Sequence, residues 1–197
     1  PLAGISVNSD THCLNGNRFD FENTSRYSRP VSGTEWFNET GLIGNSFNLY
    51  GYSFPDTGTY RIRMLSTDAE GCIGSDTIRI VVAPHPVSDF SVNDSLQCFN
   101  KNRFVFKTGI SEGVLKDWRR NDTLFQTSMS DSAVVAGLGS GQHIISLIKR
   151  SAVGCSDSSS SAIRVLNAPQ ALIGTDRDTQ CFDTHAFTFR NLSVAAG

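Results

Sequence analysis

The 197-residue chain has little charge, little lysine and no long apolar run. Charged residues make up 18% of the sequence, with 17 Lys and Arg against 19 Asp and Glu, and only four residues are lysine. A formal net charge of -2 argues against a nucleic-acid groove or an anionic membrane as partner, because both need clustered Lys and Arg. No run of 18 apolar residues occurs, so no transmembrane segment is predicted. The first residues, PLAGISV, lack the basic region of a signal peptide, and we expect the chain to be an internal piece of a longer protein.

Motifs of catalysis and metal binding are also lacking. The sequence contains no G-x-x-x-x-G-K-[ST], no H-E-x-x-H and no EF-hand loop. The four histidines, His12, His85, His143 and His185, are expected at a turn, a linker, a corner and a strand start, and none is placed beside a serine and an aspartate in the same way in every repeat. No C-x2-C pair offers a zinc site. We therefore predict no enzyme activity and no catalytic, cofactor or metal site.

Small hydroxyl residues and phenylalanine are abundant. Serine and threonine together supply 40 of the 197 residues, and 13 residues are phenylalanine. The hydrophobic fraction of 39% is enough for a packed core. This composition is typical of an extracellular all-β protein.

Internal repeats organise the chain. Three segments align, SDTHCLNGNRFDFENTS from Ser9, NDSLQCFNKNRFVFKTG from Asn93 and RDTQCFDTHAFTFRNLS from Arg177. Trp36 and Trp118, and Cys72 and Cys155, recur at nearly the same step. The offsets predict a first repeat over 1–85, a second over 86–169, and the start of a third over 170–197 that stops after its second strand.

The periodicity inside each repeat is that of β-strands. Phe19-Asp20-Phe21, Phe104-Val105-Phe106 and Tyr60-Arg61-Ile62 alternate apolar and other residues, and turn clusters such as Pro55-Asp56-Thr57-Gly58 separate such runs. About seven short strands with one central tryptophan predict an immunoglobulin-like sandwich. Tyr60 takes the place of its corner tyrosine, and His143 replaces it in the second repeat. Trp36 and Trp118 could stack on a sugar ring, but their equivalent positions favour two core tryptophans.

These landmarks carry a resemblance. The order Cys, Phe-x-Phe-x-Asn-x-Ser, Trp, Gly-Thr-Tyr and Gly-Cys resembles that of the PKD-type repeats that occur in tandem in large surface proteins of Bacteroidota. Among these proteins, SprB-like gliding-motility adhesins, which the type IX secretion system exports, offer the best comparison. The matching residues are Phe19, Phe21, Asn23, Ser25, Trp36, Gly58, Thr59, Tyr60, Gly71 and Cys72. The resemblance implies tandem PKD-like sandwiches arranged end to end, at the cell surface. As partners it implies neighbouring repeats of the same chain and the outer-membrane secretion and gliding machinery.

Five cysteines allow two disulfide arrangements, in the oxidising compartment where disulfides form. The first pairs cysteines within each repeat, Cys13 with Cys72 and Cys98 with Cys155. In an immunoglobulin-like sandwich, however, the turn after strand A and the turn before strand G lie at opposite ends, about 30 Å apart, whereas disulfide Cα atoms lie within about 7 Å. The second arrangement joins Cys13 of one repeat to Cys155 of the next. In both arrangements Cys181 needs a partner outside this sequence, and in the second so do Cys72 and Cys98.

Two further features bear on a role at the cell surface. The short linkers Val82-Ala83-Pro84-His85-Pro86 and Leu166-Asn167-Ala168-Pro169 contain proline, which favours a stiff array. An Asp-Ser/Thr-aliphatic pattern similar to that of glycosylated Bacteroidota surface proteins marks possible O-glycosylation at Thr77, Ser95, Thr123 and Ser132.

The function predicted is a non-enzymatic structural stalk segment of a long secreted adhesin, extracellular and at the cell surface, for gliding motility or surface attachment. One alternative is an accessory module of a secreted protein that binds carbohydrate or protein, with a surface polysaccharide as a possible partner. A third hypothesis is a eukaryotic receptor ectodomain, which the cysteine positions match less well.

Overall fold

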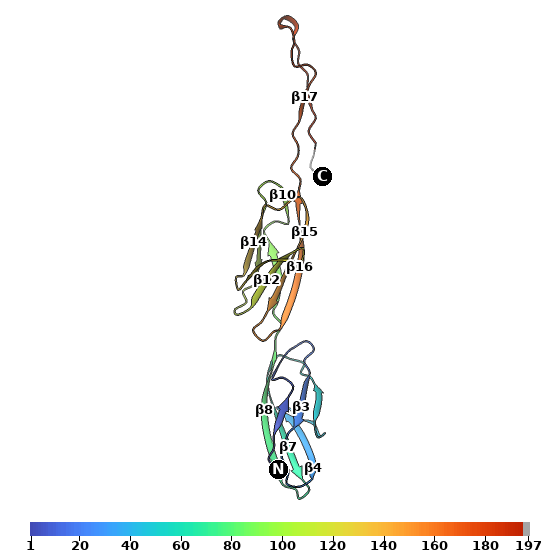
Figure 1. The fold of residues 1–197 in the computed structure, drawn as a ribbon, viewed down its shortest axis with the longest axis vertical. Coiled ribbons are helices and arrows are strands. Elements are labelled where there is room, and N and C mark those ends of the chain that lie inside the picture. Colours follow the sequence, from blue (N-terminus) through green and yellow to red (C-terminus); the bar gives the residue numbers. More distant parts are fainter. Residues whose placement is uncertain (195–197) are drawn as a thin grey trace. The chain divides into compact units, whose positions relative to one another are not determined.

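The computed structural model describes residues 1–194, and the chain divides into two compact units. The first comprises Pro1–Pro86 together with Arg150–Asp157, and the second comprises Val87–Lys149 and the chain from Ser158 onward. Both units are built from β-strands (Figure 1). No helix among the described residues is long and apolar enough to cross a membrane.

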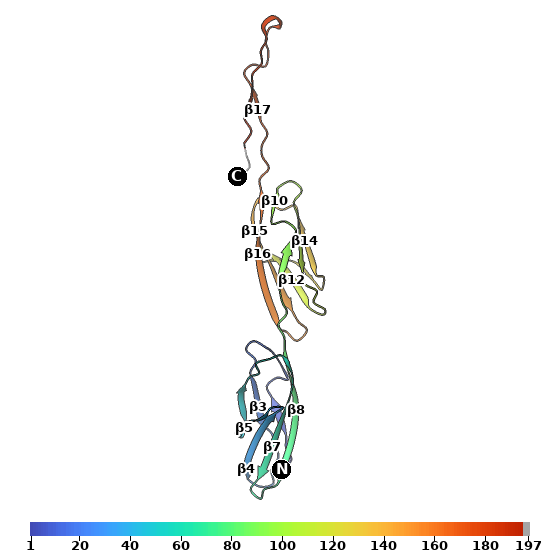
Figure 2. The same cartoon turned by 180° about the vertical axis from the view of Figure 1, so that it is seen from behind.

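The first unit is a sandwich of two sheets, seen from its two sides in Figures 1 and 2. The smaller sheet has the order β1-β3-β6 and the larger the order β2-β8-β7-β4-β5. The strands are β1 (Ile5–Val7), β2 (Thr11–Cys13), β3 (Phe19–Asn23), β4 (Val31–Asn38), β5 (Gly41–Gly44), β6 (Leu49–Tyr52), β7 (Gly58–Asp68) and β8 (Ile73–Ala83). The first segment of the repeat thus contributes β1 to one sheet and β2 to the other, an immunoglobulin-like arrangement.

The second unit repeats this topology. Its sheets have the orders β9-β11-β14 and β10-β16-β15-β12-β13. The strands are β9 (Phe90–Val92), β10 (Leu96–Cys98), β11 (Arg103–Thr108), β12 (Leu115–Arg120), β13 (Thr123–Ser128), β14 (Ser132–Ala136), β15 (Gly141–Arg150) and β16 (Ser156–Leu166). The prediction of tandem immunoglobulin-like sandwiches is confirmed, because each repeat forms two sheets around one core.

Alternating side chains from both sheets fill each core. Phe19 and Phe21 of β3 and Trp36 of β4 are fully buried in the first unit, and Phe104, Phe106 and Trp118 are fully buried in the second. Trp36 and Trp118 are therefore core residues, as predicted, and neither can stack on a sugar. A register shift follows each tryptophan, between Trp36 and Phe37 and between Trp118 and Arg119.

A buried asparagine fixes the same turn in each unit. Asn17 accepts a hydrogen bond from the Phe54 backbone N–H (2.7 Å) and donates to the carbonyls of Phe54 (3.0 Å) and Leu14 (2.7 Å). Asn102 makes the equivalent three bonds with Leu138 and Phe99. These bonds satisfy backbone groups that the strands leave unpaired. Asn17 thereby ties the segment before β3 to the loop between β6 and β7, and Asn102 ties the segment before β11 to the loop between β14 and β15.

A two-stranded ribbon follows the second sandwich. β17 (Ile173–Thr175) pairs antiparallel with β18 (Phe189–Asn191), and a short 3-10 turn (η1, Phe182–Thr184) lies between them. Phe187 and Phe189 align with Phe19 and Phe21 but are 41% and 64% exposed. β17 and β18 thus carry the apolar pattern of the repeat, but no second sheet among residues 1–194 covers these apolar side chains.

Candidate functional site

The main chemical feature is a disulfide between Cys13 and Cys155. Their Cα atoms lie 5.6 Å apart, and 142 residues separate them in sequence. Cys13 ends β2 of the first repeat, and Cys155 precedes β16 of the second repeat, in the Arg150–Asp157 segment that belongs to the first compact unit. Cys155 is only 1% exposed. This bond therefore cross-links residues of the two sequence repeats.

The position of Cys13 follows from a short parallel strand pair. β2 runs parallel to β8, with Cys13 opposite Ala83, and the Leu14 N–H donates to the Ala83 carbonyl (2.9 Å). Cys72 directly precedes the first residue of β8, so Cys13 and Cys72 lie at opposite ends of this strand, about 36 Å apart along an extended chain. The structure accordingly contains no Cys13–Cys72 pair, and by the same geometry no Cys98–Cys155 pair.

The turn that holds Cys155 has a counterpart in the first repeat. The Ser151 N–H donates to the Cys155 carbonyl (2.9 Å), and the Cys155 N–H donates to Ser151 Oγ (3.1 Å). In the first repeat the Asp68 N–H donates to the Cys72 carbonyl (3.1 Å), and the Cys72 N–H donates to Asp68 Oδ1 (3.0 Å). The glycine that precedes each cysteine has a positive φ, 88° for Gly154 and 81° for Gly71. The turn at Cys72 thus has the same pair of hydrogen bonds as the turn at Cys155, but Cys72 forms no disulfide and is exposed.

Cys98 occupies in the second repeat the position that Cys13 occupies in the first. It ends β10, lies opposite Leu166 of the parallel strand β16, and is followed by a Phe99 N–H that donates to the Leu166 carbonyl (2.8 Å). Cys98 and Cys181 are also free and exposed. Two of the three free thiols therefore occupy positions that, one repeat away, form the disulfide.

His85 lies beside the disulfide and joins three segments. The Asn15 N–H donates to His85 Nε2 (3.4 Å), so the proton of the neutral ring is on Nδ1, which donates to the Ser156 carbonyl (3.0 Å). All three residues belong to the first compact unit. The sequence showed His85 only as a linker residue, because this role depends on contacts with residues 70 and 71 positions away that no local pattern reports.

The predicted corner residues are present in both units. Tyr60 Oη donates to the Asp56 carbonyl (2.8 Å), and His143 Nε2 lies 3.0 Å from the Gly139 carbonyl. Each bond spans four residues, so histidine replaces tyrosine with the same contact. Burial, followed by the nearby carboxylates of Asp56 and Glu39, raises the pKa of the Tyr60 hydroxyl above its usual value.

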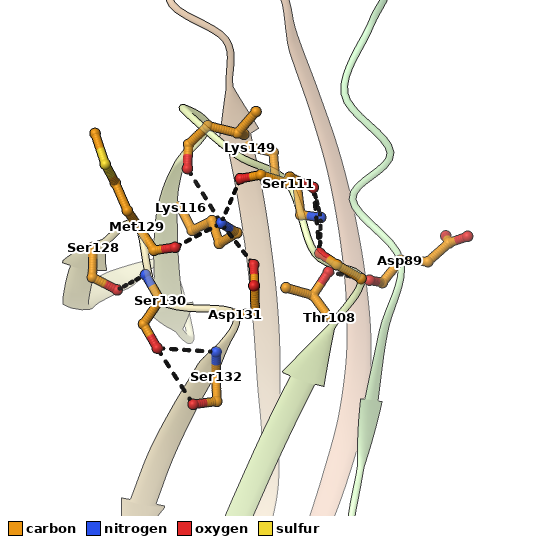
Figure 3. A network of polar contacts seen from close by, with 12 residues as sticks. Asp89, Thr108, Ser111, Lys116, Ser128, Met129, Ser130, Asp131, Ser132 and Lys149 are labelled. Atoms are coloured by element: carbon orange, nitrogen blue, oxygen red, sulfur yellow. Dashed lines mark hydrogen bonds and ion pairs between the residues drawn. The ribbon is translucent and has the colours of Figure 1, made fainter.

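Two buried lysines form a polar network in the second unit (Figure 3). Lys116 Nζ lies 2.9 Å from Asp131 Oδ1 and donates to the carbonyls of Met129 (2.9 Å), Ser111 (3.3 Å) and Val114 (3.3 Å). Lys149 Nζ donates to Ser111 Oγ (3.0 Å) and to the Gly109 carbonyl (3.2 Å). Lys116 is 0% exposed and Lys149 is 1% exposed.

Asp131 supplies the carboxylate of this network. The hydrogen bond from Lys116 lowers the pKa of Asp131 below its usual value, against an opposing effect of desolvation, and the charges of Lys116 and Lys149 act in the same direction as that bond. Sequence reasoning did not single out either lysine. The signal was available, because Lys116 stands two residues before Trp118 and therefore faces the same side of its strand.

The four predicted glycosylation residues are dispersed over both units. Thr77, Ser95 and Thr123 are exposed, whereas Ser132 is half-buried and bonded to Ser130. No group of three or more potential metal-ligating side chains occurs among residues 1–194. The four histidines lie at separate places, and in the described structure His12 packs edge-on against Phe19 while His185 contacts its own turn.

No protein family matches the sequence, and no curated protein matches it. Among solved structures, the titin I-band fragment I67–I69 is 15% identical, with 94% of this chain and 83% of that chain covered and a TM-score of 0.49. The fibronectin(III)-like modules of Clostridium thermocellum CbhA are 14% identical, with 83% and 95% covered and a TM-score of 0.45. A calcium-stabilised adhesin with which an Antarctic bacterium binds ice is 14% identical, with 89% and 52% covered and a TM-score of 0.49.

Proposed function

We propose that this chain is a non-enzymatic, load-bearing stalk segment of a secreted cell-surface adhesin. The observation that carries the proposal is the Cys13–Cys155 disulfide, which ties the first segment of one repeat to the last hairpin of the next. A covalent link between successive repeats limits how far they separate under tension. It also requires an oxidising compartment, which supports an extracellular location.

The strand arrangement suits a part that is pulled along its chain. β2 and β8 lie side by side and run in the same direction, with Thr11 opposite Val81 and Cys13 opposite Ala83. The intact disulfide carries tension from Cys13 directly to Cys155. When the bond is reduced, tension that enters before β2 and leaves after β8 slides these strands past each other, so their hydrogen bonds share the load. β10 and β16 repeat this geometry in the second unit.

The free cysteines extend the proposal to an array. Cys72 occupies the turn position of Cys155, and Cys98 the strand-end position of Cys13. In the proposed array, with repeats over 1–85 and 86–169 and a third beginning at 170, Cys72 pairs with a preceding repeat, and Cys98 and Cys181 pair with following ones.

The finer assignment rests on the resemblance of the repeats to PKD-type repeats of Bacteroidota surface proteins. On this proposal the parent chain is a type IX secretion substrate that acts in gliding motility or surface attachment. Its partners are neighbouring repeats and the outer-membrane machinery, and Thr77, Ser95, Thr123 and Ser132 are its glycosylation positions.

Single-molecule stretching of the full 197-residue chain tests the stalk role. The disulfide closes a loop of 142 residues, so oxidised molecules should extend about 500 Å less on complete unfolding than reduced ones. A Cys13→Ser/Cys155→Ser variant should match the reduced chain under both conditions, and a Cys72→Ser/Cys98→Ser variant should match the parent chain. Equal extension with and without reductant, or unfolding at forces no higher than those of a protein without mechanical function, would contradict the proposal.

A further inference from the structure

An arginine-lined groove lies on the outer face of the larger sheet of the first unit. Its volume is about 460 Å³, and it lies over the β4–β5 turn and the neighbouring part of β7 and β8. Arg61 and Arg63 project outward from β7, because the alternate residues Ile62 and Met64 are buried in the core. Both arginines and Thr77 line the groove, and Arg79 lies next to it on β8.

The pairing of these strands brings like charges together. Arg61 lies directly opposite Arg79 in the antiparallel register of β7 and β8. Like charges directly opposite each other destabilise a sheet. None of the ion pairs formed by residues 1–194 involves Arg61, Arg63 or Arg79. The free protein therefore carries a repulsion that a bound anion would relieve.

Two carboxylates lie near this cluster. Glu39 Oε1 accepts a hydrogen bond from the backbone N–H of Arg61 (2.7 Å), so this oxygen is directed to the main chain. Glu35 lies on the same face of β4, opposite Leu65. The three arginines outnumber these two acids in a chain whose formal net charge is -2.

Phe37 orients one arginine. The Arg63 guanidinium carbon lies 5.1 Å from the centroid of the Phe37 ring, a cation–π distance. A guanidinium held by its face keeps its N–H donors free at the edge. This edge can form paired hydrogen bonds with a carboxylate or a sulfate.

We propose that this groove binds an acidic polysaccharide through carboxylate or sulfate groups on its sugars. The arginine edges match such groups. A protein partner fits less well, because a protein interface gains most of its affinity from large side chains in enclosed pockets, whereas this groove lies over a turn and a sheet face. This site goes beyond the stalk role, since it uses none of the cysteines.

The second repeat provides an internal comparison. Ile144, Ser146 and Ala162 stand where the first repeat has Arg61, Arg63 and Arg79. The scaffold is retained, because Asn121 Oδ1 accepts a hydrogen bond from the Ile144 N–H (2.8 Å) just as Glu39 does from the Arg61 N–H. The arginines are therefore not needed for the fold at these positions.

Calorimetric titration of the unglycosylated full chain tests the proposal with polygalacturonate, dextran sulfate, neutral dextran and poly-L-glutamate. We expect binding of polygalacturonate or dextran sulfate that weakens with salt, and the stronger of the two identifies the preferred group. An Arg61→Ile/Arg63→Ser/Arg79→Ala variant, which carries the residues of the second repeat, should bind at least tenfold more weakly. A control with the same change in charge, Arg26→Ser/Arg103→Ser/Arg164→Ser, should change affinity less than twofold.

Thermal melting by circular dichroism separates lost binding from lost folding. Because Arg79→Ala removes a like-charge pair, its melting temperature should be equal to or above that of the parent chain. The reciprocal variant Ile144→Arg/Ser146→Arg/Ala162→Arg should gain affinity for the same polysaccharide. The proposal is overturned if the folded parent chain binds neither charged polysaccharide, binds dextran equally well, prefers poly-L-glutamate, or loses as much affinity in the control as in the groove variant. Since the cysteines are unchanged, none of these results affects the stretching experiment.

Discussion

Equivalent residues of the two repeats occupy the same place but carry different chemistry. Thr34 and Ser66 of the first unit correspond to Lys116 and Lys149 of the second, and all four are buried. In the first unit, Asn23 Nδ2 donates to Thr34 Oγ1 (3.1 Å), within a network of neutral groups. In the second, loop carbonyls and Asp131 surround two ammonium groups. Since backbone position is set by the strands, the side chains at these points are free to diverge provided that each polar group is satisfied.

The Lys116–Asp131 pair predicts an acid-sensitive second unit. The pKa of Asp131 is lowered by the hydrogen bond from Lys116, so the folded chain binds fewer protons than the unfolded chain near pH 4. This contribution to stability is present above the ordinary carboxyl pKa of about 3.9 and is lost as the pH falls through the lowered value. Asp131→Asn should therefore be less stable than the parent chain at neutral pH, with a difference that shrinks on acidification.

Urea unfolding between pH 2.5 and 7 measures this difference. A Trp36→Phe background leaves Trp118 as the one indole, so its fluorescence reports the second unit. Asp178→Asn, at an exposed bend, is the matched control and should follow the parent chain. A stability gap for Asp131→Asn that stays constant across the pH range would show that the ion pair does not act in this way.

At the scale of elements, the long strands were predictable and the short ones were not. The alternation of Phe19-Asp20-Phe21 and of Tyr60-Arg61-Ile62 indicated strands with one buried face, and β3 and β7 contain them. β2 and β10 have three residues each, too few to show a period, and they pair in parallel with β8 and β16. This parallel pairing depends on a partner about 70 residues later in the chain.

The start of β7 allows a prediction for one element. Tyr60→Phe removes the hydrogen bond to the Asp56 carbonyl at the corner before this strand. The loss should lower the free energy of unfolding of the first unit by about 0.5–1.5 kcal/mol. Urea unfolding followed by Trp36 fluorescence, in a Trp118→Phe background, measures it.

Tyr50→Phe is the control for this prediction. Tyr50 also forms a hydrogen bond through its hydroxyl, which accepts from Asn48 Nδ2 (2.8 Å), but Tyr50 is 57% exposed whereas Tyr60 is half-buried. Water replaces such a bond at little cost, so the stability should change much less. Equal losses in the two variants would mean that the corner bond has no special role.

At the scale of the whole molecule, the cysteine pairing joins residues of different repeats. Sequence reasoning left two arrangements open, and the structure contains the Cys13–Cys155 bond. The register of β2 on β8 places Cys13 beside Ala83 and away from Cys72.

Peptide mapping without reduction tests this pairing in the 197-residue chain. We expect one cross-linked peptide that contains Cys13 and Cys155, and alkylation of Cys72, Cys98 and Cys181 in the folded protein. Cys13→Ser should lower stability by about 2–5 kcal/mol, as loss of a disulfide does, whereas Cys72→Ser should have little effect. A peptide that joins Cys13 to Cys72 would contradict the arrangement and the proposed array.

The sequence by itself determined the fold class and the core aromatic residues, because alternation along a strand and the spacing of equivalent residues are local properties of the chain. It also indicated the corner contacts of Tyr60 and His143. Only the tertiary structure decided which cysteines bond, that His85 joins its three segments, that Lys116 and Lys149 are buried together, and that Arg61 faces Arg79. Each of these depends on the register between strands far apart in sequence, which is set by packing of the two sheets and leaves no periodic signal in the residues themselves.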